Sequence, residues 1–285
     1  MAGLINLAWH GGPSFSLRLG DTEVLVDPAF SRPGDYPPWF DERRANPHAP
    51  TVEAFLRVFE PRFIFITHGH FDHFDLETVR RLAAARKVVV AGSAEVTRTC
   101  REVLGLDPAR LLTLEPDRPV DLGSPGPGSV RVRPRQGPHW FTGEEGTAVA
   151  AKLAGRPDRY GAMPCGGPML GLIFEVPPGP ATVYASGDTE APDLPEGPFD
   201  VAVVSCGGEL VNPVTKLREP PFIDETTLAR QACLRLRAGV LVPVHYDHPV
   251  FQTPFDTALL AAELARYPDP PRLVVPPYNR WVELV

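Results

Sequence analysis

The first half of the chain alternates between short apolar runs and stretches whose apolar residues recur at helical spacing. The apolar runs predict strands because β-branched and aromatic residues dominate them, and Gly20-Asp21 marks a hairpin turn. Leu76, Val79 and Leu82 share one face of a predicted helix that Asp75 can cap. We expect strands at residues 4–8, 14–19, 23–26, 63–66, 88–91 and 111–114, and helices at 51–59, 75–85 and 94–104. The alternation of strand and helix from residue 63 onward indicates an α/β arrangement.

The second half is again rich in strands, which are separated by turns that contain proline and glycine. We expect strands at residues 130–133, 170–176, 181–185, 200–205, 239–244, 273–275 and 281–284, and helices at 224–237 and 254–266. Both halves therefore suit an α/β (α+β) chain in which two mixed sheets pack face to face with helices outside. A chain of 285 residues without internal repeats can build this as a single domain over 1–285.

The longest stretch without a periodic pattern is residues 29–50, which is polar, rich in proline and carries Trp39, Arg43, Arg44 and His48. A loop of this length inside a compact domain is usually functional or mobile, so the segment is a candidate lid over a site. A plain surface insertion is the alternative interpretation.

Composition narrows the function classes. Hydrophobic residues make up 43% and charged residues 22%, and no apolar run is long enough to span a bilayer. The formal net charge of −7, without basic runs mixed with aromatics, argues against nucleic-acid binding. No secretory signal opens the chain and the four cysteines form no CxxC pair, which indicates a cytoplasmic protein with reduced thiols. We therefore expect a small-molecule substrate and no stable membrane insertion, and a homo-oligomer stays open.

The densest cluster of metal-ligand side chains follows directly after the apolar run 63–66. It comprises His68, His70, Asp72 and His73, all of which suit borderline divalent metals. Residues two apart in extended backbone point the same way, so His68 and His70 can bind one ion together. Asp72 and His73 come after the chain has begun to turn, so they can address a second ion beside the first. A loop of solvated histidines, the alternative, does not account for this strand–loop–helix context.

Further residues of ligand type stand where other predicted strands end. His139, Asp188 and His245 each follow an apolar strand directly or after a short loop. The glycine before Asp188 allows the backbone to approach another segment closely. Asp27 closes the strand 23–26, and it is either a surface residue or a carboxylate that orients a metal-bound histidine.

This ordered set of HxHxDH, then His, Gly-Asp-Thr and His, resembles the metallo-β-lactamase superfamily over nearly the whole chain. The resemblance implies an αββα sandwich, in which two mixed sheets are flanked by helices and two metals lie at the edge between the sheets. By that resemblance, the first metal is held by His68, His70 and His139. The second is held by Asp72, His73 and His245, and Asp188 bridges the two.

Two divalent ions at such a site lead to hydrolytic chemistry. Two ions less two carboxylates leave the site positive enough to bind hydroxide together with an anionic or carbonyl substrate. Metal coordination lowers the pKa of bound water toward about 7, which gives a metal-bound hydroxide as the nucleophile at neutral pH. The imidazole and carboxylate ligands suit Zn, Mn or Fe, and we expect Zn or Mn.

Within the superfamily, residues 9–15 (Trp-His-Gly-Gly-Pro-Ser-Phe) and 25–28 look like the opening of the L-ascorbate-6-phosphate lactonase-like group, and residues 242–247 are similar to it as well. This resemblance implies hydrolysis of a small lactone or ester, phosphorylated or not. The chain departs from the group at Gly12-Pro13, where relatives carry His-Ala or His-Ser. Any role of that histidine is therefore absent or passes to His10.

Two other functions stay open. Phosphodiesterases that act on lipids are related to the same group, so the site could instead cleave a phosphodiester of a lipid or of a cyclic nucleotide. The second alternative is a protein of this fold that binds metal or regulates without catalysis, although none of the expected ligands is missing.

The remaining site residues are assigned from their positions. Asp72 and His248 are candidate catalytic residues, and His248, three positions after His245, is placed to donate a proton. Asp27 and His10 are candidates for orienting the metal ligands. Recognition of a phosphate would need cationic donors in the loops around the site. The candidates for this contact are Arg159, Lys216 and Arg218.

Overall fold

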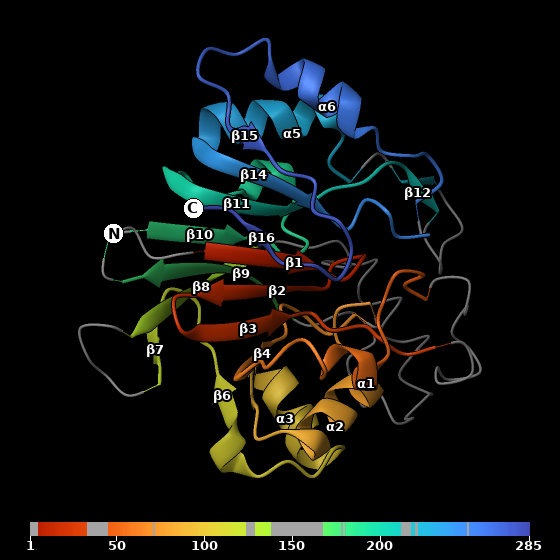
Figure 1. Ribbon diagram of the computed structural model, residues 1–285, viewed down its shortest axis with the longest axis vertical. Helices are drawn as coiled ribbons and strands as arrows, with labels where there is room; N and C mark the ends of the chain where they lie inside the picture. Colours follow the sequence, from red (N-terminus) through yellow and green to blue (C-terminus); the bar gives the residue numbers. More distant parts are fainter. Residues whose placement is uncertain are drawn as a thin grey trace.

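The computed structural model describes most of the chain. The described residues are 5–32, 45–70, 72–123, 129–137, 168–177, 179, 181–211, 218–219, 222–249 and 251–285. Their strands form two seven-stranded mixed sheets and one two-stranded sheet. The expected strands and helices are therefore organised as two large layers of strand with helices outside (Figure 1).

The first large sheet collects the N-terminal strands and one strand from the C-terminus. In spatial order its strands are β16 (Val282–Glu283), β1 (Ile5–Trp9), β2 (Phe15–Leu19), β3 (Thr22–Val26), β4 (Phe63–Phe65), β5 (Val89–Gly92) and β6 (Leu111–Thr113). The pairs from β16 to β3 are antiparallel, and β3 to β6 run parallel. Parallel neighbours need crossover connections, and helices supply them here.

The second large sheet is built from the rest of the chain. In spatial order its strands are β15 (Arg272–Leu273), β14 (Ala238–Val244), β11 (Phe199–Ser205), β10 (Ala181–Ala185), β9 (Met169–Val176), β8 (Val130–Gly137) and β7 (Val120–Leu122). The strands from β7 to β10 are antiparallel, and β10, β11, β14 and β15 run parallel. The small sheet pairs β12 (Leu210–Val211) with β13 (Arg218–Glu219).

Helices cover the outer face of each large sheet (Figure 1). Those beside the first sheet are α1 (Val52–Phe55), α2 (Leu76–Ala85) and α3 (Ala94–Glu102). Those beside the second are α5 (Glu225–Arg230), its π-helical continuation (Gln231–Arg235) and α6 (Thr257–Leu264), and 3-10 turns lie at Pro108–Arg110 and Ala191–Asp193. All five of these α-helices begin at a side chain that accepts hydrogen bonds from the first turn, as capping requires. These side chains are Thr51, Asp75, Ser93, Asp224 and Asp256.

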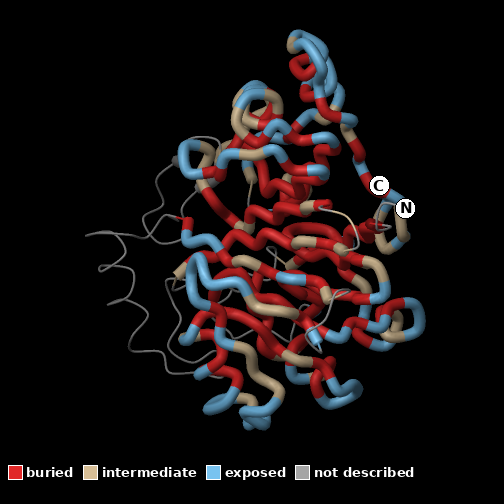
Figure 2. Tube along the Cα trace, turned by 90° about the vertical axis from the view of Figure 1, so that its left-hand side faces the viewer, coloured by how far each residue is buried: buried red, intermediate tan, exposed pale blue. Residues whose placement is uncertain are grey.

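Apolar side chains fill the space between the sheets. The central cluster joins Leu17 and Phe65 of the first sheet to Phe174 and Val203 of the second. Separate clusters lie under the helices on each side, so the chain forms the expected αββα sandwich. Figure 2 shows the buried segments concentrated in the middle of the molecule and the exposed ones at its periphery.

Most of the expected strands and helices are confirmed. They differ from the expectation where contacts with distant residues determine the end of a helix or the formation of a short strand. The helix expected over 51–59 ends at Phe55, because the following residues tighten into turns in which Arg57 donates to the carbonyl of Ala54. The helix expected over 224–237 changes to π-helical hydrogen bonding after Arg230. Strands β7, β12 and β13 were not expected, because they are short and are defined by their pairing partners.

The candidate lid, segment 29–50, is described only at its two ends. The two ends are held by hydrogen bonds, since Ser31 donates to Asp75 and Asn46 donates to the carbonyl of Gly11, while residues 33–44 lie outside the described residues.

Cys100, Cys206 and Cys233 carry free thiols. None of the described helices has the length and apolar character needed to cross a membrane.

Candidate metal centre

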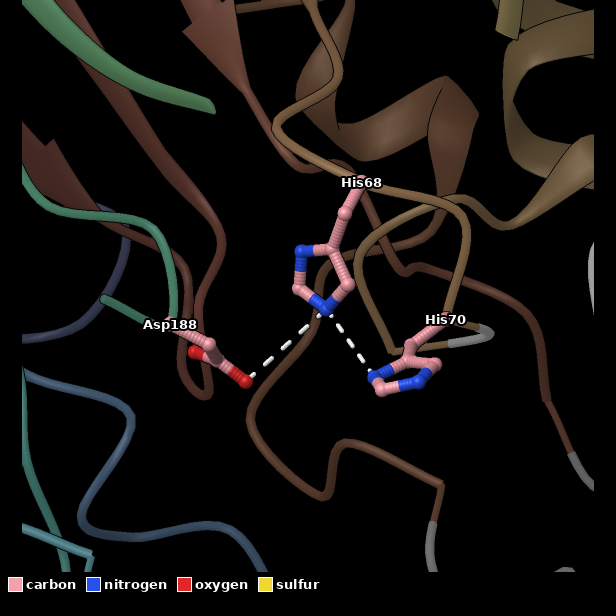
Figure 3. A group of neighbouring side chains, drawn as sticks. All are labelled: His68, His70 and Asp188. Carbon is pink, nitrogen blue, oxygen red and sulfur yellow. Dashed lines mark hydrogen bonds and ion pairs between the residues drawn. The ribbon is translucent and has the colours of Figure 1, made fainter. Parts of the chain in front are cut away.

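The histidine-rich loop after β4 brings His68 and His70 together. Strand β4 ends at Phe65, so residues 67–70 form a bend and not the extended segment expected from the sequence. The two rings converge nevertheless, with Nε2 of His68 3.0 Å from Nδ1 of His70. Asp188, from the turn after β10, places Oδ2 3.9 Å from the same His68 nitrogen (Figure 3). One ligand atom from each of the three residues lies within 4.8 Å of the others.

A second group of three lies beside the first. Asp72, His73 and His245 also offer ligand atoms within 4.8 Å of one another, and His245 Nε2 is 3.3 Å from Asp72 Oδ2. His73 Nε2 lies 3.2 Å from Oδ2 of Asp188, the oxygen that also faces His68. Asp188 thus stands between the two groups, where the sequence analysis expects the bridging carboxylate.

His139, the remaining expected ligand, lies outside the described residues. The strand that leads to it is described as far as Gly137, where a Cβ would meet Oγ1 of Thr189 at 2.9 Å. The end of β8 therefore packs beside the turn that carries Asp188. The role of His139 stays a prediction.

Asp27 lies directly behind the histidine-rich loop. Its carboxylate accepts hydrogen bonds from the backbone N–H of Thr67 (2.7 Å) and from the Thr67 hydroxyl (2.6 Å), and Oδ2 lies 2.8 Å from Nδ1 of His73. Burial raises the pKa of Asp27, while His73 and Thr67 oppose the shift. Because Nδ1 of His73 is held from behind, Nε2 is the nitrogen that faces Asp188, which fits the orienting role expected for Asp27.

The orienting role expected for His10 is wrong. Its Nδ1 pairs with Oδ1 of Asn279 and its Nε2 with the hydroxyl of Ser16, both at 2.9 Å, so both ring nitrogens are occupied away from the ligands. The ring packs edge-on against three aromatic rings beneath the first sheet, those of Phe30, Phe55 and Phe59. His10 is a buried structural histidine, and burial lowers its pKa to about 4.

His248 lies beside the second group. Its Nε2 is 3.9 Å from Oδ2 of Asp72, its ring stacks at 5.3 Å on that of His245, and only 3% of the residue is exposed. The position is consistent with the expected proton donor. Both catalytic candidates, Asp72 and His248, therefore lie at the second group.

The imidazoles of the centre balance the negative charges of its carboxylates only in part. Burial lowers the pKa of His70 to about 4, which favours the neutral imidazole, the form that binds a metal ion. Burial opposes the charge on His73, but the carboxylates of Asp188, Asp27 and Asp72 raise its pKa well above the ordinary value. Burial likewise opposes the charge on Asp72, and nearby histidines hold its pKa well below the usual range. Divalent cations would supply the positive charge that these buried carboxylates require.

The donor set fits such ions. Imidazole and carboxylate suit Zn, Mn or Fe, and Nδ1 of His245 is buried without a hydrogen-bond partner among the described residues. The candidates for phosphate recognition are not placed by the structure. Arg159 and Lys216 lie outside the described residues, and Arg218 is described only by its backbone in β13.

Three residues near the centre were missed by sequence reasoning. Thr67 bonds to Asp27 through both its backbone and its hydroxyl. The ring of Phe251 lies edge-on at 5.5 Å from that of His245, and Asp247 accepts a hydrogen bond from the backbone of Gly12. Their residue types carry no signal of these contacts, although all three adjoin expected ligands in the sequence or lie within a few positions of one.

Comparison with known proteins agrees with this geometry. A family model described as a β-lactamase superfamily domain matches residues 22–246. A metal-dependent hydrolase of Staphylococcus aureus is 26% identical over 248 residues, which cover 85% of this chain and 86% of that protein.

Two solved structures share the fold over nearly their whole length. A metallo hydrolase of the hyperthermophilic archaeon Ignicoccus hospitalis superposes with a TM-score of 0.66 at 18% identity, covering 98% of each chain. An isothiocyanate hydrolase from gut bacteria of Delia radicum superposes with a TM-score of 0.63 at 18% identity, covering 97% of this chain and 98% of that one. At these identities the likeness concerns the fold.

Proposed function

The chain belongs to the β-lactamase superfamily, and on that premise we propose that it is a metal-dependent hydrolase of small lactones or esters, with or without a phosphate group. The observation that carries the proposal is the pair of three-residue groups that meet at Asp188. Imidazoles and carboxylates gathered at this density from both sheets suit two divalent cations better than any other ligand.

The six residues would divide between two ions. One ion would be held by His68 and His70 and the other by Asp72, His73 and His245, with Asp188 shared. His139 is the further ligand expected for the first ion. Bound divalent ions would lower the pKa of a water toward about 7 and polarise the attacked carbonyl.

The side chains beside the second group would handle the leaving group. When the C–O bond of a lactone or ester breaks, the departing oxygen needs a proton. His248 can supply it, because it is buried beside the centre with Nε2 3.9 Å from Asp72 Oδ2.

A carbonyl substrate is preferred over a phosphodiester for a specific reason. A phosphodiester needs cationic donors around its oxygens. In the described part of the chain, Asp72 and Asp188 pair with histidines, which are ligands for the metals that would polarise a carbonyl. Arg159, Lys216 and Arg218 are the remaining candidates, and we propose that they would recognise the phosphate of a phosphorylated substrate.

The proposal is tested with protein that is stripped of metal and reloaded with Zn²⁺ or Mn²⁺. We expect kcat/KM on a panel of lactones and esters to exceed that on phosphodiesters by about tenfold or more, and D188N to lower kcat by about a hundredfold. D121N removes a partly exposed carboxylate that forms an ion pair with Arg131 of the neighbouring strand β8, and it should act as wild type. Turnover confined to phosphodiesters would contradict the substrate class.

Two further results separate the alternatives. Alanine at Arg159, Lys216 or Arg218 should raise KM for a phosphorylated lactone by about tenfold and leave its unphosphorylated counterpart unchanged. Protein that binds two ions and hydrolyses no member of the panel would favour a metal-binding or regulatory role without catalysis.

A further inference from the structure

We infer that Asp247 is a positioning residue that holds His245 and His248 at the centre through the turn at residues 11–13. The inference rests on the function proposed above, since it concerns the ligand and the proton donor of the second group. Asp247 touches neither ring by a hydrogen bond among the described contacts, so its action would pass through the backbone.

The backbone of Gly12 is bonded twice to the turn that carries these residues. Its N–H donates to Oδ1 of Asp247 at 2.8 Å, and its carbonyl accepts from the N–H of His245 at 2.9 Å. The two bonds close a ring between segments that are far apart in sequence. The Asp247 side chain is only 8% exposed, so its bond to Gly12 is shielded from water.

His245 needs this support because of its backbone conformation. Its φ is +73°, a left-handed conformation that is strained for a residue with a side chain and persists only where neighbouring contacts enforce it. The conformation turns the imidazole back toward Asp72 at the end of β14, and the N–H of His248 closes the turn on the carbonyl of His245 at 3.0 Å. Without the bond from Asp247 to Gly12, this turn can relax and move both rings.

Gly12 itself is shaped to receive His248. Its φ is +53°, and a Cβ built on it would lie 3.4 Å from Cδ2 of His248. Position 12 therefore borders the ring of His248.

The turn at residues 11–13 is also held by hydrogen bonds from Asn46 and Trp9, so the backbone N–H that Asp247 accepts from belongs to a well-supported turn. Asn46 donates to the carbonyls of His10 (3.1 Å) and Gly11 (2.8 Å), and the indole N–H of Trp9 donates to the carbonyl of Gly12 at 2.9 Å. A solvated surface carboxylate would not be buried against these hydrogen bonds from Asn46 and Trp9. The geometry therefore favours positioning over a general contribution to stability.

The experiment measures metal binding and needs no substrate. Metal-free wild type, D247A, D247N and D121A are dialysed against graded free Zn²⁺, and bound zinc is counted by elemental analysis. We expect two ions on wild type and D121A, and on D247A one ion at wild-type affinity with the other weakened about tenfold. H245A identifies the weakened ion, since it should weaken the same one. In D247N the amide oxygen can still accept from Gly12, so binding should return to within about twofold of wild type.

Each outcome decides the matter. Wild type that binds fewer than two ions would overturn the proposed function and this inference with it, whereas two ions on wild type and unchanged binding by D247A would overturn the inference alone. Equal loss of both ions, a D247A chain unfolded by circular dichroism, or a D247N protein as impaired as D247A would assign Asp247 to stability or charge and not to positioning.

Discussion

Two side chains of the candidate metal centre belong to residues with a left-handed backbone. Asp27 has φ +47° and His245 has φ +73°, and neither is glycine. Such conformations persist only where neighbouring contacts enforce them, and they cluster at functional sites. Asp27 donates its N–H to the carbonyl of Phe65, and His245 donates to Gly12. This backbone orients the Asp27 carboxylate toward Thr67 and Nδ1 of His73, and the His245 imidazole toward Asp72, from the ends of two strands.

A substitution at Asp27 can separate the effect of its negative charge from that of its backbone conformation. Asparagine tolerates the left-handed region, so D27N should keep the turn while removing the negative charge beside His73. We expect zinc affinity to fall about 10- to 100-fold, measured by competition with a chromophoric chelator, because the ring of His73 becomes a weaker and less oriented ligand. D121N is the control, and unchanged affinity in D27N would contradict the role assigned to Asp27.

His10 gives a prediction about pH and stability. Burial lowers its pKa from 6.5 to about 4, so the unfolded chain takes up the proton first as the pH falls. Its contribution is complete above pH 6.5 and is lost as the pH falls from 6.5 to about 4. Between about pH 7.5 and about pH 5, the stability difference between wild type and H10Q in urea unfolding should shrink by about 2 kcal/mol. A difference that stays constant over this range would show that His10 is not buried in its neutral form.

At the scale of elements, the turns that follow the strands bring the two sheets together. The turn after β10 packs on the loop after β4, and Gly187 is the point of contact, with φ +52°. A Cβ there would lie 3.0 Å from Cβ of Thr67 and 3.1 Å from Sδ of Met169. The N–H of Leu170 in β9 also donates to the carbonyl of Thr67 at 3.0 Å. Asp188 reaches His68 and His73 because this glycine permits the close approach.

The same glycine supports a comparison of two alanine variants. Gly20 also has positive φ, at +59°, but no atom lies within 4 Å of a Cβ built on it. G20A should therefore cost about 1–2 kcal/mol for the backbone alone, and G187A about 1–3 kcal/mol more for the contacts with Thr67 and Met169. Urea unfolding measures both. Equal losses of unfolding free energy in the two variants would mean that the turn after β10 accommodates the added methyl group at no further cost.

Sequence patterns predicted the elements whose own residues determine them. The buried strands β4, β11 and β14 are dominated by apolar residues, and ligand-type residues such as His245 follow some of them in the sequence. The π-helical segment after Arg230 and the short strand β7 depend on neighbours that no local pattern reveals. The position of His10 depends likewise on Phe55 and other rings from distant segments, so its environment could not be read from its place in the chain.

At the scale of the whole molecule, the centre joins the two sheets at one edge of the sandwich. Asp27, His68 and His73 come from the first sheet, and Asp188 and His245 from the second. Apolar packing holds the sheets together elsewhere, but here the facing groups are carboxylates and imidazoles. Without cations these buried polar groups are incompletely balanced. Bound divalent ions would therefore connect the sheets as well as supply chemistry.

Removal of metal should accordingly destabilise the entire fold. A ligand at a hundred times its Kd stabilises by about 2.7 kcal/mol, so two ions would contribute about 5 kcal/mol and raise Tm by about 10 °C. Calorimetry of chelator-treated and zinc-reloaded protein measures this difference. H245A removes a ligand of one ion only, so it should retain about half of the response, since His68, His70 and Asp188 stay in place. If the melting temperature were the same with and without metal, the two groups would not act as a connection between the sheets, and the tertiary contacts around Gly187 alone would hold this edge of the sandwich.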